Sequence, residues 1–171
     1  MSMEELKKEL KFSCVILNGA THNLLSFSQV VYDILRTKDG SLYGPPRGPN
    51  DPQTVTVITL NPDLFYSTTH PMERIGPQAL QIMMQALFKA TLGYEIEIES
   101  YGKPYKFNFD FVEEALRSRA VRQNIKISNF YMIGDNPKSD IAGANSNGWV
   151  SILVKTGVFD GKTKNDSQNP A

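Results

Sequence analysis

The sequence predicts an α/β fold in which a parallel sheet carries helices on its faces. Short runs rich in apolar and β-branched residues alternate with segments whose apolar residues recur at helical spacing. Stretches rich in proline and glycine separate these segments. Strands that alternate with helices favour a parallel sheet. A length of 171 residues with 40% hydrophobic content suits one domain, or one domain and part of another.

The first half of the chain is expected to contain two strands, one on each side of a helix and a long loop. Cys14 lies in the apolar run of the first strand, and we expect it to be a small core residue. Ser26 and Gln29 have the spacing of a capping box, which predicts a helix start at Ser26. The stretch 37–53 holds four prolines and three glycines and predicts a loop. The expected elements are a charged helix over 4–11, a strand over 12–17, a helix from Ser26, the loop over 37–53 and a strand over 54–60.

The second half is expected to alternate helices and strands. Pro77 fits the first position of a helix and Gly93 fits its end. Asn108 and Ser139 are suitable N-cap residues for two later helices. The apolar positions of the helix after Pro77 that we expect in the core are Leu80, Met83, Met84 and Leu87. The other expected elements are a weak strand over 95–99, a helix over 108–122, a strand over 130–133, a short helix over 139–148 and a strand over 149–154 that begins with a core residue, Trp149.

Composition and charge exclude several classes of protein. Lys plus Arg and Asp plus Glu both number 18, and this balance argues against a nucleic-acid-binding protein, which usually has a basic excess. The longest apolar runs are far shorter than the roughly 20 residues that span a bilayer. The start of the chain has neither the basic and apolar pattern of a signal peptide nor the acid-poor composition of a transit peptide. With a single cysteine, the chain is expected to be intracellular and, from sequence alone, cytoplasmic.

A first polar cluster follows the apolar run at 130–133. In Gly134-Asp135-Asn136-Pro137-Lys138-Ser139-Asp140, the glycine lets the chain turn at the strand end, and two carboxylates come near one point. Ligands bind beyond the carboxyl ends of parallel strands. Mg²⁺ typically takes one or two protein carboxylates and a substrate phosphate. The alternative is an acidic turn in which Asp140 complements the dipole of the next helix. The cluster alone supports both interpretations about equally.

A second polar cluster is Tyr101-Gly102-Lys103-Pro104, just before a helix. The glycine and proline restrict the backbone, so the Lys103 ammonium would be held as a point charge able to neutralise a carboxylate and a phosphate. For this tetrapeptide alone, a surface lysine in a turn is the simpler interpretation. The only histidines, His22 and His70, are 48 residues apart without other ligands at metal spacing, and we expect no zinc site.

Taken together, the two clusters point to a protein family more specifically than either cluster does alone. The order of YGKP, a helix, an apolar strand, GDNPKSD, a short helix and WVSILVKTGVF resembles the haloacid dehalogenase superfamily of phosphatases. The chain is most similar to subclass IIA and to its branch named for the cat-eye-syndrome critical region protein. The segments 61–66 and 101–106 carry the likeness to that branch, and the whole resemblance covers residues 12–160.

The resemblance implies a partial doubly wound parallel sheet, a haloacid dehalogenase-like core, with the remnant of an α/β cap. Residues 1–66 would be the last part of the cap and the return to the core, 67–160 the second half of the core, and 161–171 a mobile tail. The resemblance also implies Mg²⁺ as cofactor, a small phosphorylated molecule as substrate, and covalent catalysis by an aspartate. The implied roles are catalytic for Lys103, metal-binding for Asp135 with Asp140 as its helper, and substrate-binding for Asn61, Asp63 and Asn136.

The family's nucleophile motif, Asp-x-Asp, occurs nowhere in this sequence. Asn18 and Asn61 follow apolar strands, but an amide has no anionic oxygen with which to attack phosphorus. We therefore expect the first core strand and much of the cap to be missing, and the chain to self-associate or to pair with such a segment. Three hypotheses remain open: part of a phosphatase with little activity of its own, a hydrolase that uses another acid such as Asp63, and a non-catalytic module that binds phosphate and metal. The family likeness also makes a mitochondrial location possible.

Overall fold

The computed structural model describes residues 10–18 and 23–162, and it divides into two compact units. The first unit comprises Met1–Asn61 and Gly76–Ser100, and the second comprises Pro62–Ile75 and Tyr101–Ala171. The expected helix over 4–11, His22 and most of the expected tail lie outside the described residues. Each unit is an α/β arrangement with parallel strands, as the sequence predicts. The assignment of residues to a cap and a core remains a prediction.

The first unit is built on a three-stranded parallel sheet. Its strands are β1 (Cys14–Leu17), β2 (Thr56–Thr59) and β5 (Glu99–Ser100), in the order β1–β2–β5. The register places Cys14 opposite Thr56 and Leu17 opposite Thr59. The first two strands lie within their expected ranges. The weak strand expected over 95–99 is reduced to Glu99–Ser100, which begins at the last residue of that range.

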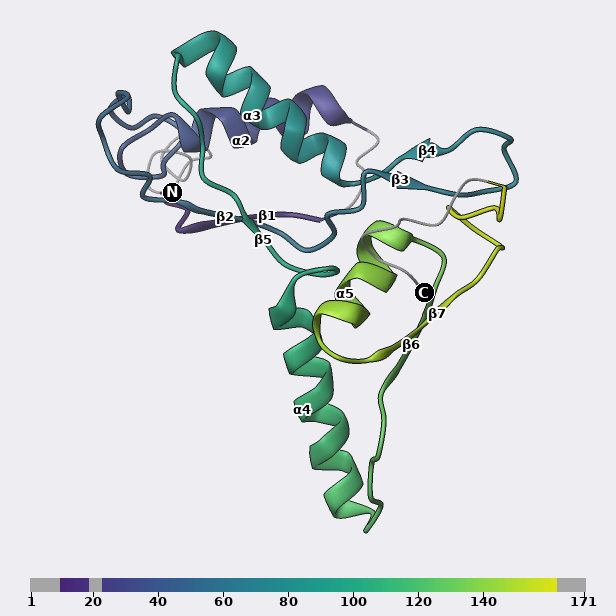
Figure 1. The fold of residues 1–171 in the computed structure, drawn as a ribbon. Coiled ribbons are helices and arrows are strands. Elements are labelled where there is room, and N and C mark those ends of the chain that lie inside the picture. The colour runs from purple at the N-terminus through teal and green to yellow at the C-terminus, as the bar shows by residue number, and fades with distance from the viewer. Residues whose placement is uncertain (1–9, 19–22, 163–171) are drawn as a thin grey trace. The chain divides into compact units, whose positions relative to one another are not determined.

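Two helices, α2 (Leu24–Leu35) and α3 (Gln78–Leu92), cover one face of this sheet (Figure 1). The core lies between the helices and the sheet and is centred on Phe88, which has no exposed surface. The Phe88 ring lies 4.9 Å from the Tyr32 ring and 6.1 Å from the Tyr94 ring, measured between centroids. The other core residues include Leu17, Val31, Ile34, Leu35, Val55, Val57, Leu80, Met84 and Ile96.

Three expectations about side chains in this unit are wrong. Cys14 is exposed because both helices lie on one face of the sheet, which is the face of the buried Leu17. Side chains alternate along a strand, so Cys14, three residues before Leu17, lies on the other face. Met83 and Leu87 of α3 are also exposed, since the buried stripe of that helix runs through Leu80, Met84 and Phe88. Apolar spacing alone could not decide which neighbour at each turn faces the sheet.

The predicted capping box is also wrong. Helix α2 begins at Leu24, and the side chain of Asn23 accepts a hydrogen bond from the Ser26 N–H at 3.3 Å. Ser26 therefore lies in the first turn, and Gln29 bonds Asp33 instead of reaching back. For α3 the predicted end is confirmed, since Gly93 ends the helix at a φ of 75°, and the predicted start is correct to within one residue, since Pro77 is the N-cap rather than the first helical residue.

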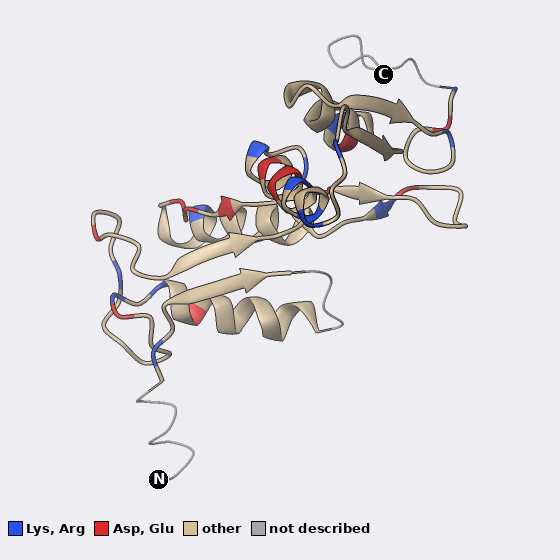
Figure 2. Ribbon diagram, turned by 90° about the horizontal axis from the view of Figure 1, so that it is seen from below, with Lys and Arg blue, Asp and Glu red and all other residues tan. Residues whose placement is uncertain are grey.

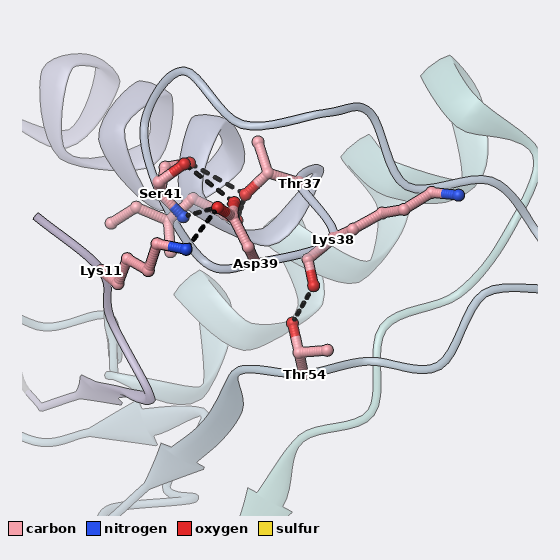
Figure 3. A network of polar contacts seen from close by, with 7 residues as sticks. Lys11, Thr37, Lys38, Asp39, Ser41 and Thr54 are labelled. Atoms are coloured by element: carbon pink, nitrogen blue, oxygen red, sulfur yellow. Dashed lines mark hydrogen bonds and ion pairs between the residues drawn. The ribbon is translucent and has the colours of Figure 1, made fainter. Parts of the chain in front are cut away.

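The loop over 37–53 contains no helix and is held by a polar network (Figure 3). The Lys11 ammonium lies 3.0 Å from the Asp39 carboxylate, which also accepts from the Ser41 hydroxyl at 2.8 Å. These hydrogen bonds from Lys11 and Ser41 hold the pKa of Asp39 below its ordinary value. The Thr54 hydroxyl donates to the Lys38 carbonyl at 3.0 Å, so the network ties the loop to the chain before β1 and the chain before β2.

The second unit contains a two-stranded parallel sheet and two helices, together with a short antiparallel hairpin. The pairs are β6 (Tyr131–Gly134) with β7 (Val150–Leu153), and β3 (Phe65–Tyr66) with β4 (Arg74–Ile75). Helix α4 spans Lys106–Arg122, and α5 spans Ala142–Ser146 after a π-helical turn over Pro137–Ile141. Tyr105 stands at the N-cap of α4, so the expectation that Asn108 begins this helix is wrong. Strands β6 and β7 agree with their predicted positions to within one or two residues.

Aromatic contacts pack α4 and α5 beside the sheet of the second unit. Trp149 is half-buried, with its ring stacked on Phe130 at 5.0 Å and edge-on to Phe109 at 5.2 Å. Its indole N–H donates to the Glu113 carboxylate at 3.1 Å. Gly143 lets the buried Phe109 ring approach α5, since a Cβ at Gly143 would lie 2.4 Å from that ring. Trp149 is thus an amphipathic packing residue rather than a fully buried one.

Charged residues of both signs are interleaved along the described chain (Figure 2). Several form ion pairs within one helix, such as Lys106 with Asp110 and Arg117 with Glu113. Within residues 10–18 and 23–162, no helix combines the length and the apolar content needed to cross a membrane.

Candidate functional site

The predicted acidic cluster forms a tight turn immediately after β6. The side chain of Asn136 caps this turn by accepting from the Lys138 N–H at 3.0 Å, and its carbonyl accepts from the Asp140 N–H at 2.9 Å. Ser139 was expected to be the N-cap, but it lies inside the π-helical turn and is buried. The proline at the start of the turn displaces the cap to the residue before it.

Asp140 is a buried carboxylate with two donors. Its side chain is 3% exposed, its Oδ1 lies 2.5 Å from the Lys103 ammonium, and its Oδ2 accepts from the Asn136 N–H at 3.0 Å. Gly134 makes this possible, because a Cβ there would lie 2.3 Å from the carboxyl group of Asp140. A buried charge needs such partners, so Asp140 and Lys103 act as a unit.

Lys103 reaches this carboxylate from the turn before α4. The turn is closed by a bond from the Tyr105 N–H to the Gly102 carbonyl at 3.0 Å, and Gly102 has a φ of 98° that favours glycine. The Lys103 side chain is 36% exposed, so its ammonium is held on one side by Asp140 and remains accessible to a ligand. An ammonium in this position can bind an anion such as a phosphate.

Asp135 is held by the chain that follows β7. Its Oδ2 accepts from the Val158 N–H at 2.7 Å, and its carbonyl accepts from the Phe159 N–H at 2.9 Å. Sequence reasoning missed Val158. The signal that could have found it is the Lys-Thr-Gly-Val turn directly after a strand parallel to β6, since the carboxyl ends of parallel strands lie at one edge.

The second unit therefore brings together five of the six predicted site residues. Asn136 connects the acidic turn to the segment before the β3–β4 hairpin, because its side-chain amide lies 3.5 Å from the Asp63 carboxylate. Asn61 follows β2 and belongs to the first unit, and it is described with that unit only. The residues gathered in the second unit are Asp63, Lys103, Asp135, Asn136 and Asp140.

The donor set fits a magnesium ion. Among the described residues, no three or more His, Cys, Asp or Glu side chains gather in one metal-binding group. Mg²⁺ needs fewer protein ligands than that, because it keeps several waters and completes its shell with substrate phosphate. Both Asp140 oxygens already have donors within the unit, whereas the Asp135 hydrogen bond given above engages only Oδ2. Asp135 would therefore be the better direct ligand of such an ion, and Asp140 would orient Lys103.

A separate groove of about 540 Å³ lies between α4 and α5 and contains none of the predicted site residues. Its walls carry charges of both signs, some of which pair with one another, as Arg117 does with Glu113 at 2.8 Å. The hydrogen bond from Arg117 holds the pKa of Glu113 below its ordinary value, and the hydrogen bond from the Trp149 indole lowers it further. The groove has the character of an ion-paired helix surface, and the candidate site is the polar cluster at the ends of β6 and β7.

Comparison with known proteins places this cluster in a family. Residues 100–171 match the family model described as HAD-hydrolase-like, and this range holds Lys103, Asp135, Asn136 and Asp140. This part of the chain is a HAD-like hydrolase domain. HAD here stands for the haloacid dehalogenase superfamily, so the superfamily resemblance seen in the sequence is confirmed over that range.

Two curated relatives match more of the chain than residues 100–171. A cardiolipin synthase (CMP-forming) / mitochondrial hydrolase fusion protein from Schizosaccharomyces pombe is 34% identical over 137 residues, which cover 78% of this chain and 22% of that protein. A mitochondrial hydrolase from Saccharomyces cerevisiae is 27% identical over 88% of this chain and 48% of its own length. The chain thus spans about half, or less, of the curated relatives that it matches.

A solved structure shares the fold over nearly the whole chain. A hypothetical protein from Pyrococcus horikoshii matches 95% of this chain and 50% of its own chain, with a TM-score of 0.50 and 20% sequence identity. This similarity supports the α/β fold class.

Proposed function

We propose that this chain supplies the phosphate-binding and magnesium-binding part of a phosphoester hydrolase. The observation that carries the proposal is the buried Asp140 carboxylate 2.5 Å from the Lys103 ammonium, in the same HAD-like domain as Asp135. This arrangement presents one accessible cation and one carboxylate at the end of a parallel sheet. Such a pair suits a phosphate monoester bound with a divalent cation.

Each residue has a distinct part in the proposed chemistry. Asp135 would hold Mg²⁺, which supplies charge neutralisation at phosphate oxygens when it is bound. Lys103 would bind a phosphate oxygen directly, and Asp140 would keep its ammonium in place. Asn136 would present its amide to the substrate together with Asp63. The substrate class that follows is a small phosphorylated molecule.

The subclass of the superfamily to which the chain belongs is also part of the proposal. The segments 61–66 and 101–106 support placement in subclass IIA, in the branch named for the cat-eye-syndrome critical region protein. In that placement residues 1–66 would be the last part of the α/β cap and the return to the core, and Asn61 would contact the substrate. Swapping residues 61–66 for an unrelated turn would leave substrate preference unchanged if this assignment is wrong.

A second candidate function is a non-catalytic module that binds phosphate and Mg²⁺. The absence of Asp-x-Asp from the sequence favours this candidate, because the covalent mechanism of the family needs an aspartate nucleophile. Such a module would use the same Lys103 and Asp135, and it would bind inorganic phosphate without turning over an ester.

One experiment tests both candidates. Hydrolysis of p-nitrophenyl phosphate by the purified chain is measured with and without Mg²⁺, and phosphate binding is measured by calorimetry under both conditions. Asp135→Ala removes the proposed metal ligand, and Asp110→Ala is the matched control, since Asp110 is an exposed helix residue. Turnover lost only in Asp135→Ala supports the hydrolase. Phosphate binding that depends on Mg²⁺ and Asp135, without turnover, supports the module. The absence of both would refute the proposed site.

The compartment is proposed from the relatives alone. Both curated relatives are named as mitochondrial hydrolases, one of them within a fusion protein, and we extend this location to the present chain. Cell fractionation with an antibody to the endogenous protein tests it, and recovery in the cytosolic fraction would support the location expected from composition instead.

A further inference from the structure

We propose that Gly157 and Val158 form a positioning device that fixes the Asp135 carboxylate. The device is a clamp of two backbone bonds: the Val158 N–H donates to Asp135 Oδ2 at 2.7 Å, and the Phe159 N–H donates to the Asp135 carbonyl at 2.9 Å. One residue thus has both its side chain and its main chain bonded to the same short segment. The value of this clamp for metal binding rests on the proposed function.

The clamp requires a glycine next to the donor. A Cβ at Gly157 would lie 1.8 Å from Asp135 Oδ2, 2.4 Å from its Cγ and 2.7 Å from its Cβ. Gly157 is not among the glycines with positive φ, so the backbone conformation itself would accept alanine. The need for glycine at this position is a need for space beside the Asp135 side chain.

The clamp also determines which oxygen is available. A backbone N–H bonded to an ionised carboxylate makes a short, charge-assisted bond, and here it engages Oδ2. Oδ1 would then be the oxygen through which Asp135 holds a cation. Groups that orient a metal ligand typically change metal affinity by about 10–100-fold when they are removed. We therefore expect Gly157→Ala to weaken Mg²⁺ binding by about that factor, because the new methyl group displaces the carboxylate.

The clamp can be tested with and without metal. Calorimetric titration of the whole chain with Mg²⁺ compares the unmodified protein, Gly157→Ala and the control Gly48→Ala, whose added Cβ would meet Asp51 at an ordinary 3.4 Å. The metal-free readout is the NMR signal of the Val158 amide, which reports the bond to Asp135 directly. Gly157→Ala should shift this signal and weaken Mg²⁺ binding, while Gly48→Ala changes neither.

The outcomes separate the clamp from the proposed function. If the unmodified chain binds no Mg²⁺, the proposed function fails, and the Val158 amide still decides whether the clamp exists. If Gly157→Ala binds Mg²⁺ as tightly as the unmodified chain, or leaves the Val158 signal unchanged, the clamp is refuted. If Gly157→Ala does not fold, the double variant with Asp135→Gly decides, because it removes the three Asp135 atoms nearest to the added methyl group. If the clamp exists, the double variant folds as the single variant Asp135→Gly does. A double variant that is still unfolded overturns the clamp.

Discussion

The ion pair between Lys103 and Asp140 gives the sharpest prediction about stability. Replacing Lys103 by methionine keeps most of the side-chain length but removes the charge that faces a carboxylate with only 3% exposure. At 2.5 Å and an effective dielectric constant of 20, the Coulomb energy of the pair is roughly 7 kcal/mol. Desolvation of the carboxylate and solvent screening at the partly exposed lysine oppose this. We expect Lys103→Met to cost about 1–3 kcal/mol of unfolding free energy.

The assay uses the single tryptophan. Trp149 lies in the same unit as the pair, so urea unfolding followed by its fluorescence reports the stability of that unit. Lys106→Met is the matched control, because the Lys106 side chain is 73% exposed and pairs with Asp110 within one helix. We expect that control to cost less than about 0.5 kcal/mol.

A double variant tests the reason for the loss. In Lys103→Met with Asp140→Asn, the buried group is neutral, so a substantial part of the stability lost in Lys103→Met should return. The reasoning is refuted if Lys103→Met costs no more than Lys106→Met, or if the two changes at 103 and 140 are simply additive.

Two further predictions concern the other unit and the exposed sheet face. Lys11 and Ser41 lower the pKa of Asp39 in the folded chain. The ionised Asp39 carboxylate therefore stabilises the fold fully above its ordinary pKa of 3.8, and this contribution is lost as the pH falls through the lowered folded value. Asp39→Asn should flatten the loss of thermal stability below about pH 4 in circular dichroism melts, and equal acid-side slopes would contradict this. The outer face of β6 and β7 exposes Ile133 by 65% and Ile152 by 42%, and we expect the chain to self-associate through it. Ile133→Lys should reduce this in sedimentation velocity runs at two concentrations, whereas a concentration-independent monomer before substitution would count against it.

The local structure was largely predictable because its signals are local. Proline before the start of α3 and glycine at its end gave both boundaries, and β-branched runs gave β1 and β2. Caps were predicted less well. Asn23, Asn136 and Tyr105 hold the positions expected for Ser26, Ser139 and Asn108, because several residues near each helix start could serve and backbone geometry selects among them.

Side-chain exposure was only partly predictable. The sequence marks Cys14 and Met83 as apolar, but it does not say that both helices of the first unit pack on one face of its sheet. The exposure of Cys14 follows from that choice of face, and the exposure of Met83 follows from the side of α3 that faces the sheet. The same applies to β6 and β7, where Tyr131, Ile133, Val150 and Ile152 are apolar and exposed. A pattern of period two identifies a strand, but it cannot show whether anything covers its second face.

The sequence by itself determined which chemical groups this chain has: a lysine in a constrained turn, two carboxylates after a strand, and no Asp-x-Asp. Only the tertiary structure decided how these groups pair. Lys103 meets Asp140 across 37 residues of sequence, and Val158 reaches Asp135 across 23. Spacing along the chain carries no information about such contacts. They form because parallel strands and the turn before α4 bring distant segments to one edge of a sheet, where a buried carboxylate such as Asp140 must find donors.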